Sequence, residues 1–436
     1  MAVSKKTDTP GGLSPRAPQT AGARTTVPVP RAWLVGLSIA VVLPWIILGG
    51  VYLAGGTAAP IAPAGGIEPQ PAAATQAASG PWGQLTMTPI VVSPPIEYVA
   101  ADWGRVTGGE WRFPGVTREM LAAFLTAAGF TAEQISTLQS TARSDPQTGG
   151  LVIAPDLALV RSLTQEQRAR LYSQLARTTL NPDQVNAFSF YGTSVDEWLA
   201  GSPIAPQTRQ LIEPLIYRHD GFMHFADAGL VHALIADPLE RQRLAKVLLR
   251  EATMLVRLTV RDAAEVTQLA EYWGRGGRAT DVRPLLESVV GAGGDSSIDV
   301  VHLLPSFARN RLYRYPKLTT ADLDKPLLAN CLWTALNFFR AEPDDRFLDV
   351  ATALSTLRRE YYIVENTFRL GDIVALLDTE GNLFHVAVYL ADDLVFTKNG
   401  TSPVSPWIII PIDRLEAFYA SRAPNPRLIY HRRSDF

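Results

Sequence analysis

The sequence predicts an α+β fold for the folded part of this chain, on two observations. Between residues 96 and 300, helix-capping residues are followed by apolar residues at helical spacing. After residue 301, helical stretches give way to short runs rich in β-branched and aromatic residues. Helices followed by a strand cluster are typical of an α+β domain with an antiparallel sheet. The 436 residues, 47% of them hydrophobic, suffice for two or three domains.

The N-terminal region predicts a membrane anchor. Residues 1–32 are rich in Pro, Gly, Ser and Thr and should form a disordered cytoplasmic tail. Residues 33–54 carry no charge and match the roughly 20 residues of a transmembrane helix. The nearby basic residues precede this span, which predicts a single-pass protein of the cytoplasmic (inner) membrane. The later domains would be exported to the periplasm or the cell exterior. A cleaved signal peptide is the alternative.

Residues 55–95 are mostly Ala, Pro, Gly, Gln and Thr. This composition predicts an extended, semi-rigid linker between the membrane and the folded domains.

The sequence pattern of residues 96–300 predicts a mostly helical domain. The stretches Thr131–Gln134 and Thr164–Gln167 have the pattern of capping boxes, and Asp237 and Asp262 stand where helix N-caps are expected. A glycine-rich break at residues 291–294 predicts a domain boundary near 300.

Residues 301–436 predict a second, α+β domain. Helical patterns cover residues 331–341, 346–360 and 413–420. The predicted strands are Ile373–Leu377, His385–Leu390, Leu394–Thr397, Trp407–Ile410 and Leu428–His431.

Cys331, the only cysteine of the chain, is the candidate nucleophile. Asn330 is a good N-cap, which places Cys331 in the first turn of a helix. The helix dipole and the unpaired amides there favour a thiolate. The alternative is that Cys331 is a small, buried apolar residue, as free cysteines commonly are.

His385 is the candidate base and Asn399 its candidate orienting partner. If residues 391–393 form a three-residue hairpin loop, Leu390 lies opposite Leu394 and His385 lies opposite Asn399. The asparagine oxygen could then hold one ring nitrogen while the other faces the thiol. A structural histidine and a turn asparagine are the plainer alternatives.

These residues resemble the NlpC/P60 superfamily of papain-like cysteine peptidases. In that family, a helix-initial Cys, a Gly-Asp turn, a His at the start of the next strand and a third polar residue follow in order. Cys331, Gly371-Asp372, His385 and Asn399 occupy those places here. The resemblance covers roughly residues 305–432. It departs from the family at the nucleophile, where Asn330-Cys331-Leu332 replaces the usual Asp-Cys-Ser.

The resemblance implies a thiol hydrolase that cleaves an amide bond in the stem peptides of cell-wall peptidoglycan, and the predicted anchor makes it membrane-anchored and exported. Cys331 would attack the carbonyl, His385 would transfer the proton, and Asn399 would orient the ring. Two alternatives stay open. One is a non-catalytic papain-like module that binds an envelope polymer, and the other is an acyltransferase with the same Cys–His pair.

Other partners receive little support from the sequence. The net charge of −2 gives no indication of nucleic-acid binding, and a single cysteine excludes an internal disulfide. Several histidines and aspartates crowd residues 218–232, but their spacing matches no usual metal site. The sequence therefore predicts neither a metal nor a cofactor.

Overall fold

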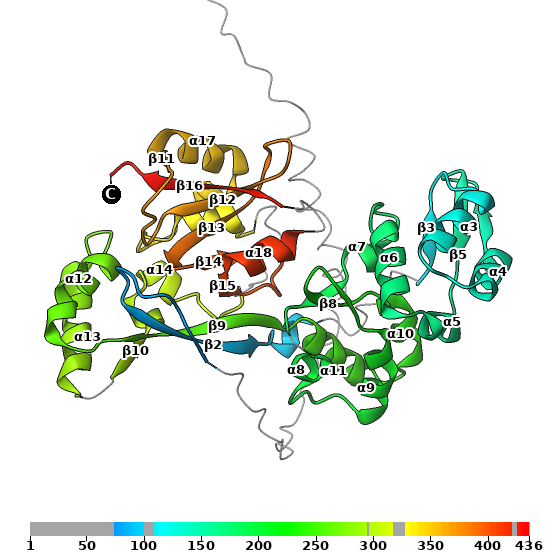
Figure 1. The fold of residues 1–436 in the computed structure, drawn as a ribbon, viewed down its shortest axis with the longest axis horizontal. Coiled ribbons are helices and arrows are strands. Elements are labelled where there is room, and N and C mark those ends of the chain that lie inside the picture. The colour runs from blue at the N-terminus through cyan, green and yellow to red at the C-terminus, as the bar shows by residue number, and fades with distance from the viewer. Residues whose placement is uncertain are drawn as a thin grey trace, which may run out of the picture.

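The computed structural model describes residues 74–99, 109–192, 194–293, 296–316, 328–420 and 425–435. The predicted tail, the predicted span at 33–54 and the first part of the predicted linker lie outside these ranges. None of the helices in these ranges combines the length and the apolar composition that a membrane span requires. The described part is a mixed α+β protein in two lobes, which Figure 1 shows side by side.

The C-terminal lobe is built on a six-stranded antiparallel sheet with the strand order β11-β16-β12-β13-β14-β15. The predicted strands are confirmed to within two residues at either end. The sheet also contains β11, which the sequence pattern did not reveal. Its strands are β11 (Tyr361–Val364), β12 (Ile373–Leu377), β13 (Leu383–Ala391), β14 (Leu394–Lys398), β15 (Trp407–Pro411) and β16 (Arg427–Arg433).

Helices cover both faces of this sheet (Figure 1). On one face, α16 (Cys331–Leu336) and α17 (Val350–Glu360) pack with the 3-10 turn η4 (Asp345–Leu348). On the other face lies α18 (Ile412–Tyr419), whose Leu415 is fully buried. Alternate residues of each strand point to opposite faces, so each face has its own apolar cluster. We call them the α16 face and the α18 face.

A second sheet joins the C-terminal lobe on the α16 side. It has four antiparallel strands in the order β1-β2-β9-β10 and shares one continuous apolar core with the α16 face. Its elements and the helices beside it are β1 (Thr75–Gln76), β2 (Gln84–Val92), β9 (Glu251–Thr259), β10 (Ser297–Asp299), α12 (Ala263–Trp273), α13 (Ala279–Gly291), η3 (Val300–Leu303) and α14 (Ser306–Arg309).

This sheet corrects the predicted linker, because residues 75–76 and 84–92 are strands rather than spacer. The run from Gln84 to Val92 is rich in Thr, Val and Ile, and Leu85 is fully buried. Pro89 lies beyond the two residues of β2 that pair with β1, so its missing N–H can face an unpaired edge.

The other lobe has its own apolar core, formed from residues between Val99 and Leu248. It is not purely helical, since two three-stranded sheets, β3-β5-β4 and β6-β8-β7, accompany the helices. Its elements are η1 (Ile96–Tyr98), β3 (Trp111–Phe113), α3 (Arg118–Ala127), α4 (Ala132–Thr141), β4 (Arg143–Asp145), β5 (Gly150–Ile153), α5 (Leu157–Ser162), α6 (Gln165–Leu175), α7 (Pro182–Val185), β6 (Phe188–Phe190), α8 (Val195–Leu199), α9 (Pro206–Ile212), η2 (Glu213–Leu215), β7 (Tyr217–His219), β8 (Phe222–Phe225), α10 (Ala228–Leu234) and α11 (Pro238–Leu248).

The predicted helix starts in this lobe are confirmed. Thr131 with Gln134 and Thr164 with Gln167 form complete capping boxes, and the side chain of Asp237 caps α11. The domain boundary differs from the prediction near 300. Residues 254–312 belong to the core of the C-terminal lobe, so the two cores divide the chain near residue 250. The predicted break begins at the end of α13, at Gly291, and β10 of the same lobe follows it, while Gly294 lies outside the described residues.

Candidate functional site

Cys331 is the first residue of α16, as the sequence predicts. The Asn330 side chain accepts a hydrogen bond of 2.9 Å from the backbone N–H of Trp333, which caps the helix. Cys331 is partly exposed and packs against the core on the α16 face, where α16 lies against β13. The candidate nucleophile therefore belongs to this face of the sheet.

His385 lies on the opposite face. In β13 it pairs directly with Leu376 of β12, and Leu376 belongs to the α18-face cluster. Directly paired residues point to the same side of a sheet, so the imidazole faces α18. The neighbouring Val386 pairs with Ala375 and faces α16 instead. The structure thus does not bring the candidate base to the candidate nucleophile.

Both ring nitrogens of His385 have partners on the α18 face. Nε2 lies 2.9 Å from the hydroxyl of Thr397, and Nδ1 lies 2.9 Å from the hydroxyl of Tyr419 in α18. The ring of Tyr419 also lies against the imidazole, with the centroids 4.6 Å apart. Only 2% of His385 is exposed. These contacts make His385 a link between β14 and α18.

The predicted hydrogen bond between His385 and Asn399 is absent. The predicted register is present further along the hairpin, where Val388 pairs with Phe396. The loop itself is shorter than predicted, because Ala391 pairs with Leu394 and leaves a two-residue turn. Thr397 holds the ring instead, and both polar atoms of the Asn399 side chain are buried without a hydrogen bond.

Lys398, not His385, is the titratable residue of this hairpin that shares the α16 face with Cys331. It pairs with Trp407, whose indole belongs to the α16-face core. The Lys398 side chain is fully buried, and its Nζ donates to the carbonyl oxygens of Gly400 at 3.0 Å and Ser402 at 2.8 Å. Residues two apart in a strand point to the same face. The position of Lys398 two residues after the apolar Phe396 was therefore the sequence signal that could have identified it.

Burial controls the protonation of both groups. It lowers the pKa of Lys398 to about 7, although nearby Cys331 and Glu251 favour the charged form. It raises the pKa of the Cys331 thiol, against the opposing effects of the Val386 backbone and the Lys398 ammonium. At neutral pH, the thiol therefore stays mostly protonated, unlike the thiolate of an activated cysteine.

The Gly371-Asp372 turn has a structural role in this lobe. The Asp372 carboxylate accepts hydrogen bonds from two nitrogens of Arg432 in β16, at 2.9 and 2.7 Å. Gly371 has a φ of +90°, and a Cβ there would lie 2.0 Å from the ring of Phe339. The turn thus joins β12 to the segment after α16 and to the neighbouring strand.

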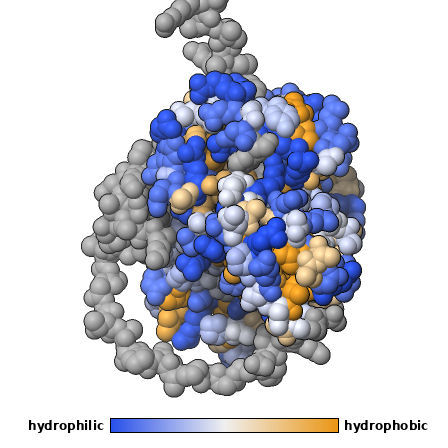
Figure 2. Space-filling model, turned by 90° about the vertical axis from the view of Figure 1, so that its left-hand side faces the viewer, coloured by the Kyte–Doolittle hydropathy of each residue, from blue (hydrophilic) through white to orange (hydrophobic). Residues whose placement is uncertain are grey.

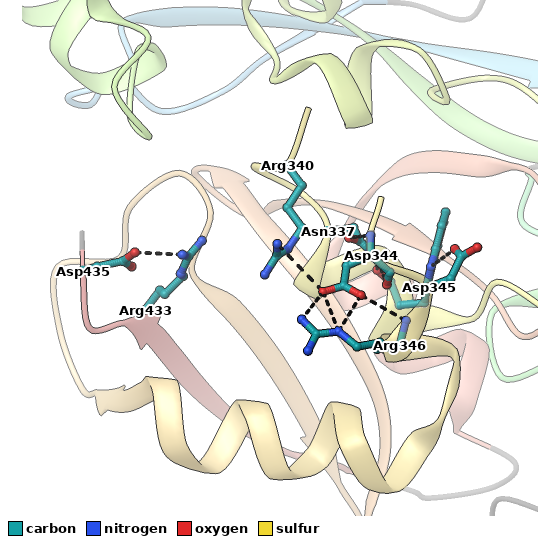
Figure 3. A network of polar contacts seen from close by, with 8 residues as sticks. Asn337, Arg340, Asp344, Asp345, Arg346, Arg433 and Asp435 are labelled. Carbon is teal, nitrogen blue, oxygen red and sulfur yellow. Dashed lines mark hydrogen bonds and ion pairs between the residues drawn. The ribbon is translucent and has the colours of Figure 1, made fainter. Parts of the chain in front are cut away.

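A polar network fixes the end of α16 to the following turn (Figure 3). The Asn337 side chain accepts a bond of 2.7 Å from the backbone N–H of Asp344. The Asp344 carboxylate is held by Arg346, which lowers its pKa to about 2. Asn337 is the C-cap residue of α16, so these contacts join the C-terminal end of the helix to the turn that follows it.

Of the histidines of the 218–232 region, His219 and His224 lie in the β7–β8 hairpin and His232 lies in α10. The His224 ring is bonded to the hydroxyl of Ser189 at 2.8 Å and to the carbonyl of His219 at 3.2 Å. Among the described residues, no group of three or more metal-ligating side chains occurs.

Comparison with known proteins returns no relative of this chain. No family model matches it, and no curated protein and no solved structure is significantly similar.

Proposed function

We propose that this chain is a membrane-anchored, exported envelope protein whose C-terminal papain-like domain binds cell-wall peptide or another envelope polymer without cleaving it. The observation that supports the absence of cleavage is that Cys331 and His385 lie on opposite faces of the sheet. A histidine must lie within hydrogen-bond reach of a thiol to remove its proton. Here the imidazole is bonded to Thr397 and Tyr419, while the thiol has a raised pKa.

Co-sedimentation with insoluble peptidoglycan tests this function. The full chain, in detergent, is incubated with peptidoglycan, and the pellet is assayed for protein while the supernatant is analysed for released peptides by mass spectrometry. The proposal predicts that the wild type and Cys331→Ala bind equally and release no new peptide ends. Absence of binding to any of several wall types would contradict it.

A second candidate is the amide hydrolase, with Lys398 in place of His385 as the base. Its support is that Lys398 lies on the face of Cys331, close enough for each to shift the pKa of the other. A lysine with a pKa near 7 is neutral in part of the molecules and can accept a thiol proton. Cys331 would then attack an amide carbonyl, and Lys398 would return the proton to the leaving amine. Water would hydrolyse the resulting thioester, which releases the acid and restores the thiol.

The same incubation distinguishes this candidate. Hydrolysis predicts new peptide ends from the wild type that both Cys331→Ala and Lys398→Met fail to produce, with His385→Gln still active. New ends that are lost in His385→Gln would contradict the lysine mechanism. If a soluble amine acceptor is incorporated instead of water, the reaction is acyl transfer.

A further inference from the structure

A serine and a histidine in the three-stranded sheet β6-β8-β7 form a pair that neither proposed function uses. Ser189 of β6 and His224 of β8 are direct partners in this sheet, and the Ser189 hydroxyl lies 2.8 Å from Nδ1 of His224. In enzymes with a nucleophilic serine, the hydroxyl lies within this reach of its base, and a third group orients the base. The pair therefore has the first feature of an activated serine.

The third group is a backbone carbonyl, which fixes the tautomer of His224. Nε2 lies 3.2 Å from the carbonyl oxygen of His219, and a carbonyl oxygen accepts hydrogen bonds but cannot donate them. Nε2 therefore carries the ring proton, and Nδ1 presents its lone pair to the Ser189 hydroxyl. A second acceptor for that hydroxyl, the carbonyl oxygen of Ala187, lies farther away, at 3.2 Å. Burial lowers the pKa of His224 to about 4, so the ring is uncharged at neutral pH and can accept a proton.

The pair lies at the junction of the two lobes. Phe222 stands two residues before His224 in β8, so both side chains point to the same face of the sheet, and their rings are 6.2 Å apart. On that face, Phe222 contacts Phe418 of α18, with the ring centroids 5.9 Å apart. Ser189 and His224 are both partly exposed. Ligand sites commonly lie at such interfaces between domains.

Aromatic side chains surround the pair. Tyr217 of β7 pairs with His224 and stacks on its ring, with the centroids 5.4 Å apart. Tyr191 lies 5.2 Å from Phe222, and Arg414 of α18 lies over the Tyr191 ring at 4.0 Å. On the side of the molecule away from this junction, which Figure 2 shows, hydrophobic residues form small separate patches among hydrophilic ones. An aromatic setting with one polar pair suits a small apolar group that carries a single reactive carbonyl.

We infer that Ser189 is the nucleophile of an esterase site that removes a small acyl group from an alcohol, with His224 as its base. Oγ of Ser189 forms a bond to the acyl carbon, and its proton passes to Nδ1 of His224. The bond between the acyl carbon and the alcohol oxygen then breaks, and the alcohol leaves with that proton. Water, deprotonated by the same ring, hydrolyses the acyl-serine, which releases the acid and restores the hydroxyl. An ester suits this weak base better than an amide, because an alcohol is the better leaving group.

Hydrolysis of p-nitrophenyl acetate by the full chain in detergent tests this inference. All proteins carry Cys331→Ala, so that the thiol cannot react with the ester. We expect hydrolysis above the rate in buffer, and a loss of roughly tenfold or more in Ser189→Ala and in His224→Gln. Ser173→Ala is the matched control and should keep the full rate, because Ser173 is also bonded to a histidine, His219, at 3.1 Å.

Three results of this assay would overturn the inference. The first is no hydrolysis above the rate in buffer, and the second is an equal rate with and without Ser189→Ala. The third is a loss of activity in Ser173→Ala alone. That result would assign the reaction to the other pair, in which Ser173 and Asp220 contact the same ring nitrogen of His219.

Labelling with a fluorophosphonate is a check that does not depend on the choice of ester. A nucleophilic serine displaces fluoride from this reagent and keeps the phosphonyl group. Mass spectrometry of the digested protein should find that group on Ser189, and His224→Gln should lose it while its circular dichroism stays that of the wild type. If His224→Gln does not fold, Ser189→Ala still decides, because its side chain is partly exposed. A label on other serines alone would contradict the assignment.

Discussion

At the scale of single residues, the structure contains a buried carboxyl group whose surroundings favour the protonated form. Asp227 accepts a 2.5 Å hydrogen bond from the hydroxyl of Tyr172, and burial raises its pKa to about 7. Arg168 opposes this rise, and Asp183 adds to it. Two buried oxygens here, Oδ2 of Asp227 and Oε1 of Gln184, have no hydrogen bond. A proton on Asp227 would turn one of these acceptors into a donor.

Asp227→Asn should therefore change how stability depends on pH. The folded pKa lies above the unfolded value, so folding favours the proton, and this contribution is lost as pH rises from about 4 to about 7. The free energy of unfolding of Asp227→Asn relative to wild type should increase between pH 5 and pH 8, by on the order of a few kcal/mol. Urea unfolding at both pH values measures it. A difference that does not depend on pH would contradict the assignment.

At the scale of elements, the strands and caps could be predicted because their signals are local. Capping boxes and β-branched runs identify where elements begin and end, and these predictions hold. The face to which His385 points could not be predicted. Both faces of the sheet are buried, so apolar side chains occupy both of them. The strand sequences therefore lack the alternation of apolar and polar residues that would assign a side chain to one face. A register shift between Leu376 and Leu377 also alters the pairing next to His385.

The turn before β12 provides a prediction at this scale. Gly371→Ala requires a left-handed conformation for alanine and places its Cβ against the ring of Phe339. We expect a loss of about 2–4 kcal/mol in the free energy of unfolding, from backbone strain and overpacking together. Gly381→Ala is the matched control, because Gly381 also has a positive φ but a Cβ there meets no atom within 4 Å. Equal losses in the two variants would show that Phe339 has no effect.

At the scale of the whole molecule, the lobe whose core runs from Val99 to Leu248 is inserted in the sequence between two neighbouring strands, β2 and β9. Val92 at the end of β2 pairs with Glu251 at the start of β9, so residues 93–250 leave and return at adjacent points. Figure 1 shows β9 extending toward this lobe. The sequence predicted a boundary near 300 because a glycine-rich break is a local signal. The pairing of β2 with β9 joins residues about 160 positions apart, which no local pattern reveals.

Removal of the inserted lobe tests this organisation. Replacing residues 93–250 by a two-residue Asn-Gly turn should leave the C-terminal lobe folded, because such a turn connects paired antiparallel strands. A fragment of residues 301–436 should fail to fold, since it lacks β2, β9, α12 and α13 of the shared core. Thermal unfolding followed by circular dichroism measures both. Cooperative unfolding of the 301–436 fragment would contradict the boundary near 250.

The most direct test of the separation of Cys331 from His385 is the rate at which iodoacetamide alkylates Cys331 as a function of pH. Wild type and His385→Gln are compared as full chains, with folding checked by circular dichroism and labelling measured by mass spectrometry. We predict that the rate rises with pH in a single step, above the pKa of an ordinary cysteine, and identically in both proteins. Fast labelling below pH 7 that disappears in His385→Gln would show that the imidazole reaches the thiol and would contradict the account.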